Sequence, residues 1–272
     1  MILYPPAKIN LGLHVLRKRS DGFHEIESVM YPVPFYDILE ILPAQINSFH
    51  QSGIIFADTH EKNICEQTVD LMQSKFNTPP VSIHLRKQIP VGAGLGGGSA
   101  DAAFVVLGLN ELFSLGLSHV EMEEIAATLG SDCPFFIQNK VRMVSGRGEI
   151  LNEVKCDLSE YYLVLLNPKI HVSTKEAYSK VTPKENQSNV ASILQENIST
   201  WQSSLKNDFE SPICKQYPLI QECIDQLKIS GAIYAAMSGS GSTVFGIFSN
   251  SEYNLPSFLT EYIIFQGFFA QQ

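Results

Sequence analysis

The sequence predicts an α+β protein built as two lobes. Three observations support this: strand-like and helix-like segments follow one another along the whole chain, the length of 272 residues exceeds the commonest domain size, and 44% of the residues are hydrophobic while 17% are charged. Such a composition supports a substantial packed core. We place the boundary between the lobes near residue 150, so that residues 1–150 form the first lobe and residues 151–272 the second.

Apolar residues that alternate with others predict the strands of the first lobe, because successive side chains of a strand point to opposite faces. Ile9, Leu11, Leu13 and Val15 alternate in this way. The expected strands are residues 2–17, 26–33, 36–42 and 81–87. A turn at residues 20–22 separates the first two strands, which we therefore expect to form a hairpin.

Helices of the first lobe are indicated by apolar residues spaced for one buried face and by capping residues. Ala102, Val106 and Leu109 have this spacing, and Ser118 with Glu121 has the form of a capping box. The expected helices are residues 63–76, 99–112 and 118–129.

The second lobe continues the mixed pattern of strands and helices. The expected strands are residues 162–166, 232–237 and 243–248, and the expected helices are residues 174–181 and 219–228. A second glycine-rich stretch, residues 238–242, joins the last two strands. Its small residues permit either a tight turn or a close approach of the backbone to a ligand.

Charge and hydropathy argue against two kinds of partner. The net charge of −9 gives no general attraction for nucleic acid. The first residues lack the pattern of a signal peptide, and no apolar run reaches the roughly 18 residues that would cross a bilayer. We therefore expect that the protein binds neither nucleic acid nor a membrane. We also expect a monomer or homodimer, a choice that charge and hydropathy do not decide.

The cysteines and histidines show no spacing typical of a disulfide scaffold or a metal site. Five cysteines are scattered along the chain without a C-x-x-C pair, and seven histidines form no ligand pattern. We therefore expect a cytoplasmic protein without a tightly bound metal.

A glycine-rich segment, residues 90–100, directly precedes one of the expected helices. Glycine lets backbone N–H groups approach an anion closely, and the first N–H groups of a helix are free to bind it. The Ser99 hydroxyl adds another donor or a ligand for magnesium. The segment is therefore a candidate site for nucleotide phosphates, formed by Pro90, Val91, Gly92, Ala93, Gly94, Leu95, Gly96, Gly97, Gly98, Ser99 and Ala100.

Other interpretations of these glycines are less favoured. Gly92, Gly94 and Gly97 fit G-x-G-x-x-G, but a dinucleotide fold requires an acidic residue about 20 positions on that ends the next strand. Glu111 instead falls inside an expected helix. The Walker pattern also fails because no Lys-Ser or Lys-Thr follows the glycines. A flexible turn is the remaining alternative.

Two further residues are candidates for catalysis. Asp132 follows a helix and precedes an apolar stretch, where it acts either as a turn residue or as a carboxylate that deprotonates a substrate hydroxyl. Lys8 lies in an apolar strand. Its side chain either reaches water from an edge or is buried, where it stabilises negative charge during phosphoryl transfer.

Three stretches, in order along the chain, resemble the motifs of the superfamily named for galactokinase, homoserine, mevalonate and phosphomevalonate kinases, the GHMP kinases. They are residues 5–11, 94–103 and 238–243. Within that superfamily, residues 7–13, 19–24, 130–135 and 207–210 are similar to the enzymes that phosphorylate a cytidylyl-methylerythritol substrate. Ala100 departs from the family's usual second serine, and Phe23 stands where tyrosine is frequent.

The resemblance implies a GHMP-kinase fold, with an N-terminal lobe like domain 2 of ribosomal protein S5, a ferredoxin-like C-terminal lobe and the active site in the cleft between them. It implies that ATP, accompanied by Mg²⁺, phosphorylates the 2-hydroxyl of 4-(cytidine 5′-diphospho)-2-C-methyl-D-erythritol to give the 2-phosphate and ADP, in the non-mevalonate isoprenoid pathway. Residues 1–150 would then bind ATP and residues 151–272 the substrate.

The same resemblance assigns roles to individual residues. Asp132 is the expected catalytic base and Lys8 its partner. Asn63 is an expected nucleotide contact. Asn10 and Thr174 are expected substrate contacts.

The substrate's cytosine is expected to lie between two aromatic side chains. By resemblance, Phe23 and Tyr178 stack on its faces and His24 forms a hydrogen bond with its edge. A mevalonate- or homoserine-type kinase is the alternative, against which the Gly22-Phe23-His24 turn argues. A nucleotide-binding protein without catalysis would be expected to lack Lys8 or Asp132, and both are present.

Overall fold

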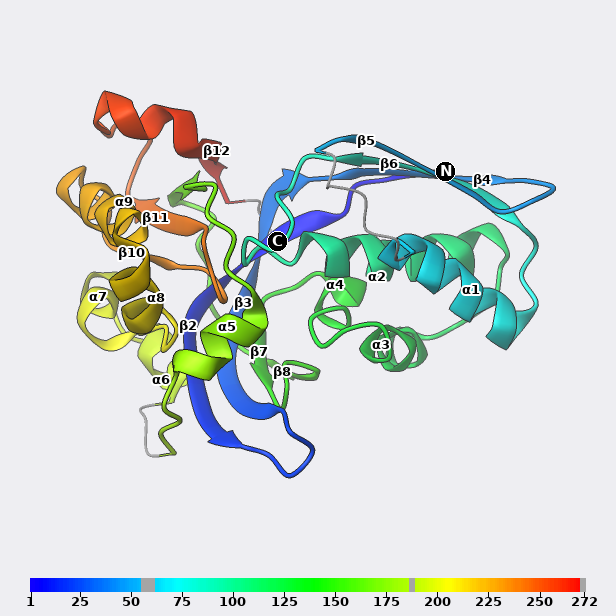
Figure 1. The fold of residues 1–272 in the computed structure, drawn as a ribbon, viewed down its shortest axis with the longest axis horizontal. Coiled ribbons are helices and arrows are strands. Elements are labelled where there is room, and N and C mark those ends of the chain that lie inside the picture. Colours follow the sequence, from blue (N-terminus) through cyan, green and yellow to red (C-terminus); the bar gives the residue numbers. More distant parts are fainter. Residues whose placement is uncertain (55–61, 186–188, 270–272) are drawn as a thin grey trace. The chain divides into compact units, whose positions relative to one another are not determined.

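The computed structural model describes residues 1–54, 62–185 and 189–269, which form two compact units (Figure 1). The first unit consists of residues 1–7, 34–91 and 96–140, and the second of residues 8–33, 92–95 and the chain from 141 onward. Each unit is therefore assembled from separate stretches of chain. This division by contacts does not test the boundary at residue 150, which stays a prediction.

A mixed four-stranded sheet is the frame of the first unit, with the order β1-β4-β6-β5. Its strands are β1 (Ile2–Leu3), β4 (Ile38–Pro43), β5 (Ser48–Gly53) and β6 (Val81–Lys87). β4 pairs antiparallel with β1 and β6, and β5 runs parallel to β6. Alternate residues of β6 are buried, beginning with Val81 and ending with Lys87, so one face of this sheet is covered.

Two helices, α1 (Ile64–Phe76) and α2 (Gly97–Leu112), lie along that face (Figure 1). Two more, α3 (His119–Ala127) and the short α4 (Phe135–Gln138), pack on α2. α2 is central, because it packs against the other three helices and against β4. Gly108 permits this close approach: a Cβ atom there would lie 2.6 Å from Ile41 Cδ1 and 2.8 Å from Leu3 Cδ1.

The second unit contains two sheets. The first has the order β2-β3-β7-β8 and includes β2 (Pro6–Lys18), β3 (His24–Tyr36), β7 (Arg142–Ser145) and β8 (Ile150–Glu153), of which β2 and β3 also give residues to the first unit. The turn expected at residues 20–22 joins β2 to β3, with Arg19 N–H donating to the Phe23 carbonyl at 2.8 Å. β2 is buried from Pro6 to Val15, which its apolar sequence favours.

The other sheet is antiparallel, with the order β10-β11-β9-β12. Its strands are β9 (Tyr162–Leu166), β10 (Tyr234–Met237), β11 (Val244–Phe248) and β12 (Ile263–Phe268). Taken in chain order, these strands have the arrangement of a ferredoxin-like sheet. The second crossover of that fold, between β11 and β12, is reduced to the 3₁₀ helix η2 (Ser257–Tyr262).

The longer connection, from β9 to β10, carries the helices of this unit. They are α5 (Thr174–Lys180), α6 (Val190–Leu194), η1 (Ile198–Thr200), α7 (Trp201–Ser204), α8 (Glu210–Gln216) and α9 (Pro218–Ile229). α9 packs on β10 and β11. Its buried Ile220, Ile224 and Leu227 join residues of β9 and β11, such as Val164 and Val244, in one hydrophobic core.

All of the helices expected from the sequence are present, with ends that differ by at most two residues. The capping box at Ser118 is confirmed. The strand expected over residues 36–42 is divided: β3 ends at Tyr36 and β4 begins at Ile38, because the intervening Asp37 turns inward to accept backbone hydrogen bonds. Within the described ranges no helix is long and apolar enough to cross a bilayer.

Candidate active site

The glycine-rich segment ends at the start of α2 in a conformation that requires glycine. Gly92, Gly94 and Gly96 have φ angles of +66°, +81° and +71°, which side chains disfavour. Gly96 is the N-cap of α2, and among the described residues no side chain caps this helix end. The N–H groups of the first turn are therefore available for an anion.

The second glycine-rich stretch closes on the first. A Cβ atom on Gly94 would lie 2.0 Å from the Ser238 carbonyl oxygen. The Ser238 hydroxyl donates to the Gly94 carbonyl at 2.8 Å, and Thr243 N–H donates to the Ala93 carbonyl at 3.2 Å. The sequence left open whether residues 238–242 form a tight turn or approach a ligand. In the structure this stretch contacts the first glycine-rich segment and supports it.

Lys8 is buried and tied to the same loop. Its side chain lies in β2 with 3% of its surface exposed, so it does not extend to water. Lys8 Nζ donates to Asn10 Oδ1 at 2.6 Å, and its backbone N–H donates to the Leu95 carbonyl at 2.9 Å. The Ser238 hydroxyl accepts from Asn10 N–H at 3.3 Å. Lys8, Asn10 and the middle of the loop therefore form one hydrogen-bonded cluster.

Asp132 lies in the loop between α3 and α4, and this loop meets the start of α2. The neighbouring Cys133 is hydrogen-bonded to Ser99, in the first turn of α2. Burial raises the pKa of the Cys133 thiol to about 12, against the opposing effect of Ser99. Gly130 permits the tight loop, because a Cβ atom there would lie 3.1 Å from Cys133 Sγ. The first unit therefore brings the Asp132 loop to the helix end that follows the glycines.

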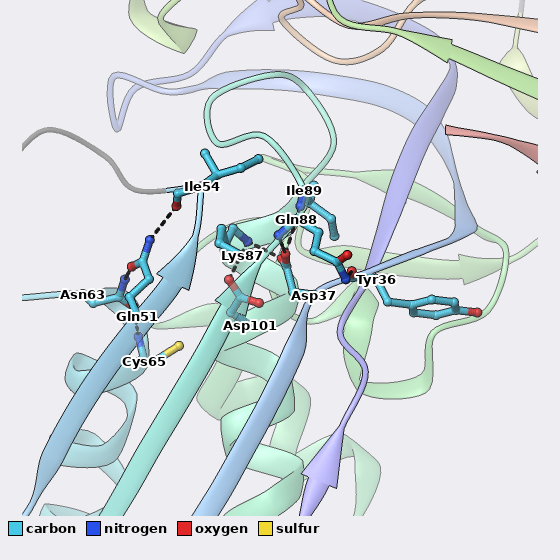
Figure 2. A network of polar contacts seen from close by, with 10 residues as sticks. All are labelled: Tyr36, Asp37, Gln51, Ile54, Asn63, Cys65, Lys87, Gln88, Ile89 and Asp101. Atoms are coloured by element: carbon cyan, nitrogen blue, oxygen red, sulfur yellow. Dashed lines mark hydrogen bonds and ion pairs between the residues drawn. The ribbon is translucent and has the colours of Figure 1, made fainter. Parts of the chain in front are cut away.

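A buried ionic network lies at the N-terminal end of α2 (Figure 2). Lys87, Asp37 and Asp101 are each at most 2% exposed. Lys87 Nζ donates to Asp101 Oδ2 at 2.7 Å and to Asp37 Oδ2. Burial opposes the charge of Lys87, but the two carboxylates outweigh it and raise its pKa. No local pattern in the sequence indicates this network, because Lys87 only ends an alternating strand.

Burial raises the pKa of Asp101 to about 7, a shift that Lys87 opposes and Asp37 reinforces. Because this value lies above that of an unfolded carboxyl group, the folded state binds the proton more tightly, and the resulting stabilisation is lost as pH rises toward 7. The amide of Asp101→Asn does not titrate, so this variant does not lose that stabilisation. Its free energy of unfolding, relative to that of the wild type, should therefore rise by on the order of 2–4 kcal/mol between about pH 4 and 7. Urea unfolding across this range measures the gain; a difference independent of pH would contradict the prediction.

Two expected substrate residues, His24 and Tyr178, lie together in the second unit. Their rings stack with centroids 4.7 Å apart and an interplanar angle of 15°, while Phe209 meets Tyr178 edge-on at 4.8 Å. Burial, and then the charge of Lys18, lower the pKa of His24. Its ring is therefore neutral at pH 7 and able to accept a hydrogen bond.

Phe23 and Thr174 are available to solvent. Phe23 is 50% exposed, and Arg147 Cζ lies 4.7 Å from the centroid of its ring. Thr174 is exposed at the first position of α5, after the N-cap Ser173. The ring stacked on Tyr178 in this structure is that of His24, so a cytosine between Phe23 and Tyr178 stays a prediction.

Asn63 serves as the N-cap of α1 (Figure 2). Its Oδ1 accepts from Cys65 N–H at 2.9 Å, and its Nδ2 donates to Gln51 Oε1 at 3.4 Å. These contacts account for an asparagine at this position without a ligand. The expected contact with the nucleotide stays a prediction.

Asn207 and Glu210 support the site in a way that their sequence did not reveal. Asn207 Nδ2 donates to the carbonyls of Met237 and Gly239, both at 2.8 Å, and Glu210 Oε2 accepts from Met237 N–H at 2.9 Å. Their hydrogen bonds hold the backbone at the start of the second glycine-rich stretch in place. The resemblance of residues 207–210 to a kinase family was the only sequence signal for them.

Gly98 offers a direct test of the expected phosphate site. No described heavy atom outside its own helix lies within 4 Å of the position of a Cβ atom there. Alanine also favours a helix over glycine by about 1 kcal/mol. We therefore expect Gly98→Ala to keep or raise the melting temperature and to raise the KM for Mg-ATP several-fold, because the methyl group enters the space above the helix end. An unchanged KM would place the phosphates elsewhere.

The chain matches two family models, the GHMP kinases N terminal domain over residues 63–140 and the GHMP kinases C terminal over residues 185–261. Together with the uncapped glycine-rich helix start, these matches define an ATP-dependent small-molecule kinase of the GHMP class. Two relatives named 4-diphosphocytidyl-2-C-methyl-D-erythritol kinase come from Cytophaga hutchinsonii and Bacteroides fragilis strain NCTC 9343. The first is 48% identical over 92% of this chain and 93% of the relative, and the second 47% identical over 93% of each. The chain belongs to this kinase family.

Solved structures agree with the fold. A crystal structure of 4-(cytidine 5′-diphospho)-2C-methyl-D-erythritol kinase superposes with a TM-score of 0.77 at 31% identity, covering 91% of this chain and 90% of the other. Mevalonate kinase from Methanococcus jannaschii superposes with a TM-score of 0.64 at 12% identity over 91% and 90% of the two chains. The second similarity concerns the fold alone. The predicted two-lobed GHMP-kinase fold class is thereby confirmed.

Proposed function

We propose that the protein transfers the γ-phosphoryl group of ATP to the 2-hydroxyl of 4-(cytidine 5′-diphospho)-2-C-methyl-D-erythritol. The observation that carries this proposal is the cluster in which the buried Lys8 ammonium group donates to Asn10 while the Lys8 backbone N–H donates to the Leu95 carbonyl of the glycine-rich segment. A buried cation on a residue whose backbone is bonded to such a segment is suited to phosphoryl transfer. The names of the relatives at 47–48% identity support the choice of substrate.

In the proposed reaction, the substrate hydroxyl oxygen forms a bond to the γ-phosphorus, the bond to the β–γ bridging oxygen breaks, and ADP leaves. Asp132 accepts the hydroxyl proton. The N–H groups at the start of α2 hold the phosphates, and Lys8 offsets the negative charge that develops on the nucleophile and the transferred group. Phosphoryl transfer depends mainly on such positioning and charge neutralisation.

Magnesium accompanies ATP in this proposal. The ion neutralises charge on the phosphate oxygens when bound. The uncapped helix end and the Ser99 hydroxyl in its first turn fit a magnesium-bound phosphate chain. We propose the Ser99 hydroxyl as the protein group beside the ion.

We assign recognition of the cytidylyl group to the second unit. Phe23 offers an exposed ring for stacking, and the neutral His24 ring is able to accept a hydrogen bond from the amino group of cytosine. Asn10 and Thr174 are the other proposed substrate contacts, and Tyr178 the second stacking residue. All five cysteines, each within the described ranges, are free, which fits the reducing cytoplasm as the place of action.

The decisive experiment measures ADP release by the purified protein with Mg-ATP and one acceptor at a time. We expect turnover with the cytidylyl substrate and only background release with mevalonate, homoserine or no acceptor. Phosphorus NMR of the product should show a new phosphomonoester on the substrate. Release above background with mevalonate or homoserine alone would replace this proposal with the other kinase type.

A further inference from the structure

The two ends of the glycine-rich segment, the loop proposed to bind phosphate, meet at Lys87. Lys87 ends β6, the strand that leads into the loop, and Gly97 begins α2, the helix that leaves it. A Cβ atom on Gly97 would lie 3.0 Å from Lys87 Nζ and 2.9 Å from Ile89 Cγ2. The ammonium group therefore lies directly against the first residue of the helix, and Gly97 leaves room for it.

The two aspartates connect this ammonium group to both ends of the loop (Figure 2). On the entry side, Asp37 Oδ1 accepts from the N–H groups of Gln88 and Ile89 at 2.6 Å and 2.9 Å. On the exit side, Asp101 extends from the second turn of α2 and accepts from Lys87 Nζ at 2.7 Å. The spacing between residues 89 and 97 is thus set by one chain of contacts, Asp37 to Lys87 to Asp101.

Stability of the fold alone does not account well for the Asp101 carboxylate. Lys87 is already paired with Asp37, which also accepts two backbone hydrogen bonds. Asp101 Oδ1 is buried and has no hydrogen-bond partner among the residues that the structure describes. A second buried carboxylate with an unpaired oxygen costs stability. Such a cost is typical of a residue kept for function.

We propose that Asp101, acting through Lys87, is a positioning residue for ATP, which holds the start of α2 at the distance from β6 that the nucleotide phosphates require. The proposal rests on the function proposed above and extends it to residues that do not touch the substrate. Because backbone donors bind phosphate only within a narrow geometry, a shift of the helix end weakens nucleotide binding. Chemistry at the second substrate is unaffected once ATP is bound.

Asp101→Ala tests this directly, because it removes the link to α2 and leaves the Lys87–Asp37 pair intact. We expect a roughly tenfold rise in the Kd for Mg-ADP and in the KM for Mg-ATP, with an unchanged kcat and an unchanged KM for the cytidylyl substrate. Asp101→Asn keeps an oxygen acceptor for Lys87 and should restore nucleotide affinity. Lys87→Met is not informative, because it would leave two buried carboxylates without a cation.

Asn110→Ala is the matched control at the other end of α2, where Asn110 Oδ1 accepts from Leu117 N–H at 2.9 Å. It removes a polar contact of the same helix far along the axis from the loop, and we expect an unchanged KM for Mg-ATP. Equal losses of ATP affinity in the two alanine variants, or no loss in Asp101→Ala, would overturn the proposal. So would a failure of Asp101→Asn to restore affinity in a folded protein.

Calorimetry with Mg-ADP separates this inference from the proposed function. Wild-type protein that binds Mg-ADP but releases no ADP with the cytidylyl substrate would refute the proposed function and leave the test of Asp101 in place. Wild-type protein that does not bind Mg-ADP would refute both.

Discussion

Asp132→Asn is expected to lower kcat by about a hundredfold or more, because an amide does not accept the proton of the substrate hydroxyl. The affinity for Mg-ATP should be unchanged, since the side chains are nearly the same size and we propose that backbone N–H groups at the start of α2 hold the phosphates. ADP release at saturating substrates measures kcat, and calorimetry with Mg-ADP measures nucleotide affinity. The two measurements together separate a chemical role from a binding role.

Asp225→Asn provides the control for this prediction. Asp225 lies on α9 with about half of its side chain exposed and pairs with Lys228 at 3.5 Å. Its replacement removes one carboxylate of the same type and should leave kcat and the melting temperature unchanged. Full turnover by Asp132→Asn would remove Asp132 from the mechanism, and the base would then have to be sought elsewhere.

Lys8→Met should lower kcat by about a hundredfold, the typical loss when one group that stabilises transition-state charge is removed. Methionine keeps an unbranched stem of similar size in the buried site and removes the ammonium group. Because the backbone bond from residue 8 to the Leu95 carbonyl survives, the loop should keep its position and the affinity for Mg-ATP should change little. Steady-state kinetics with each substrate varied in turn tests this separation.

The matching control is Lys62→Met, since Lys62 is 61% exposed and pairs with Asp70 on the surface. If Lys8→Met loses kcat and its melting temperature also falls well below that of the wild type, Lys8 has a structural role instead. Lys8→Arg keeps the charge but requires more room than a buried site offers, so we expect it not to restore turnover.

Local patterns in the sequence predicted most of the elements. α3 was located by its capping box at Ser118, and β2 by the alternation of residues 9–15. β5 (Ser48–Gly53) was not expected, because its polar sequence has no strand pattern and it forms by pairing with β6. β7 and β8, of four residues each, are too short to show a pattern.

The sequence predicts those site residues that a local pattern marks, but not those whose contacts form only in the folded chain. The glycine loop stands out in sequence because glycines and a helix start are adjacent, and Lys8 because a charge interrupts an apolar strand. Asp37, Lys87 and Asp101 come from distant parts of the chain, and nothing local marks them as partners. Asn207 likewise reaches the stretch at residues 237–239 only through tertiary packing.

The discontinuous make-up of the two units has a consequence for synthesis on the ribosome. All stretches of the first unit have been translated by residue 140, whereas the second unit needs residues from 141 onward to cover residues 8–33. The β2–β3 hairpin, buried along β2 from Pro6 to Val15 in the finished protein, is therefore covered only after the second half of the chain has been made. At roughly 5–20 residues per second, translation of that half leaves an apolar hairpin uncovered for on the order of ten seconds. Because transiently exposed apolar surface favours aggregation, we expect the nascent chain to be more prone to aggregate than the folded enzyme.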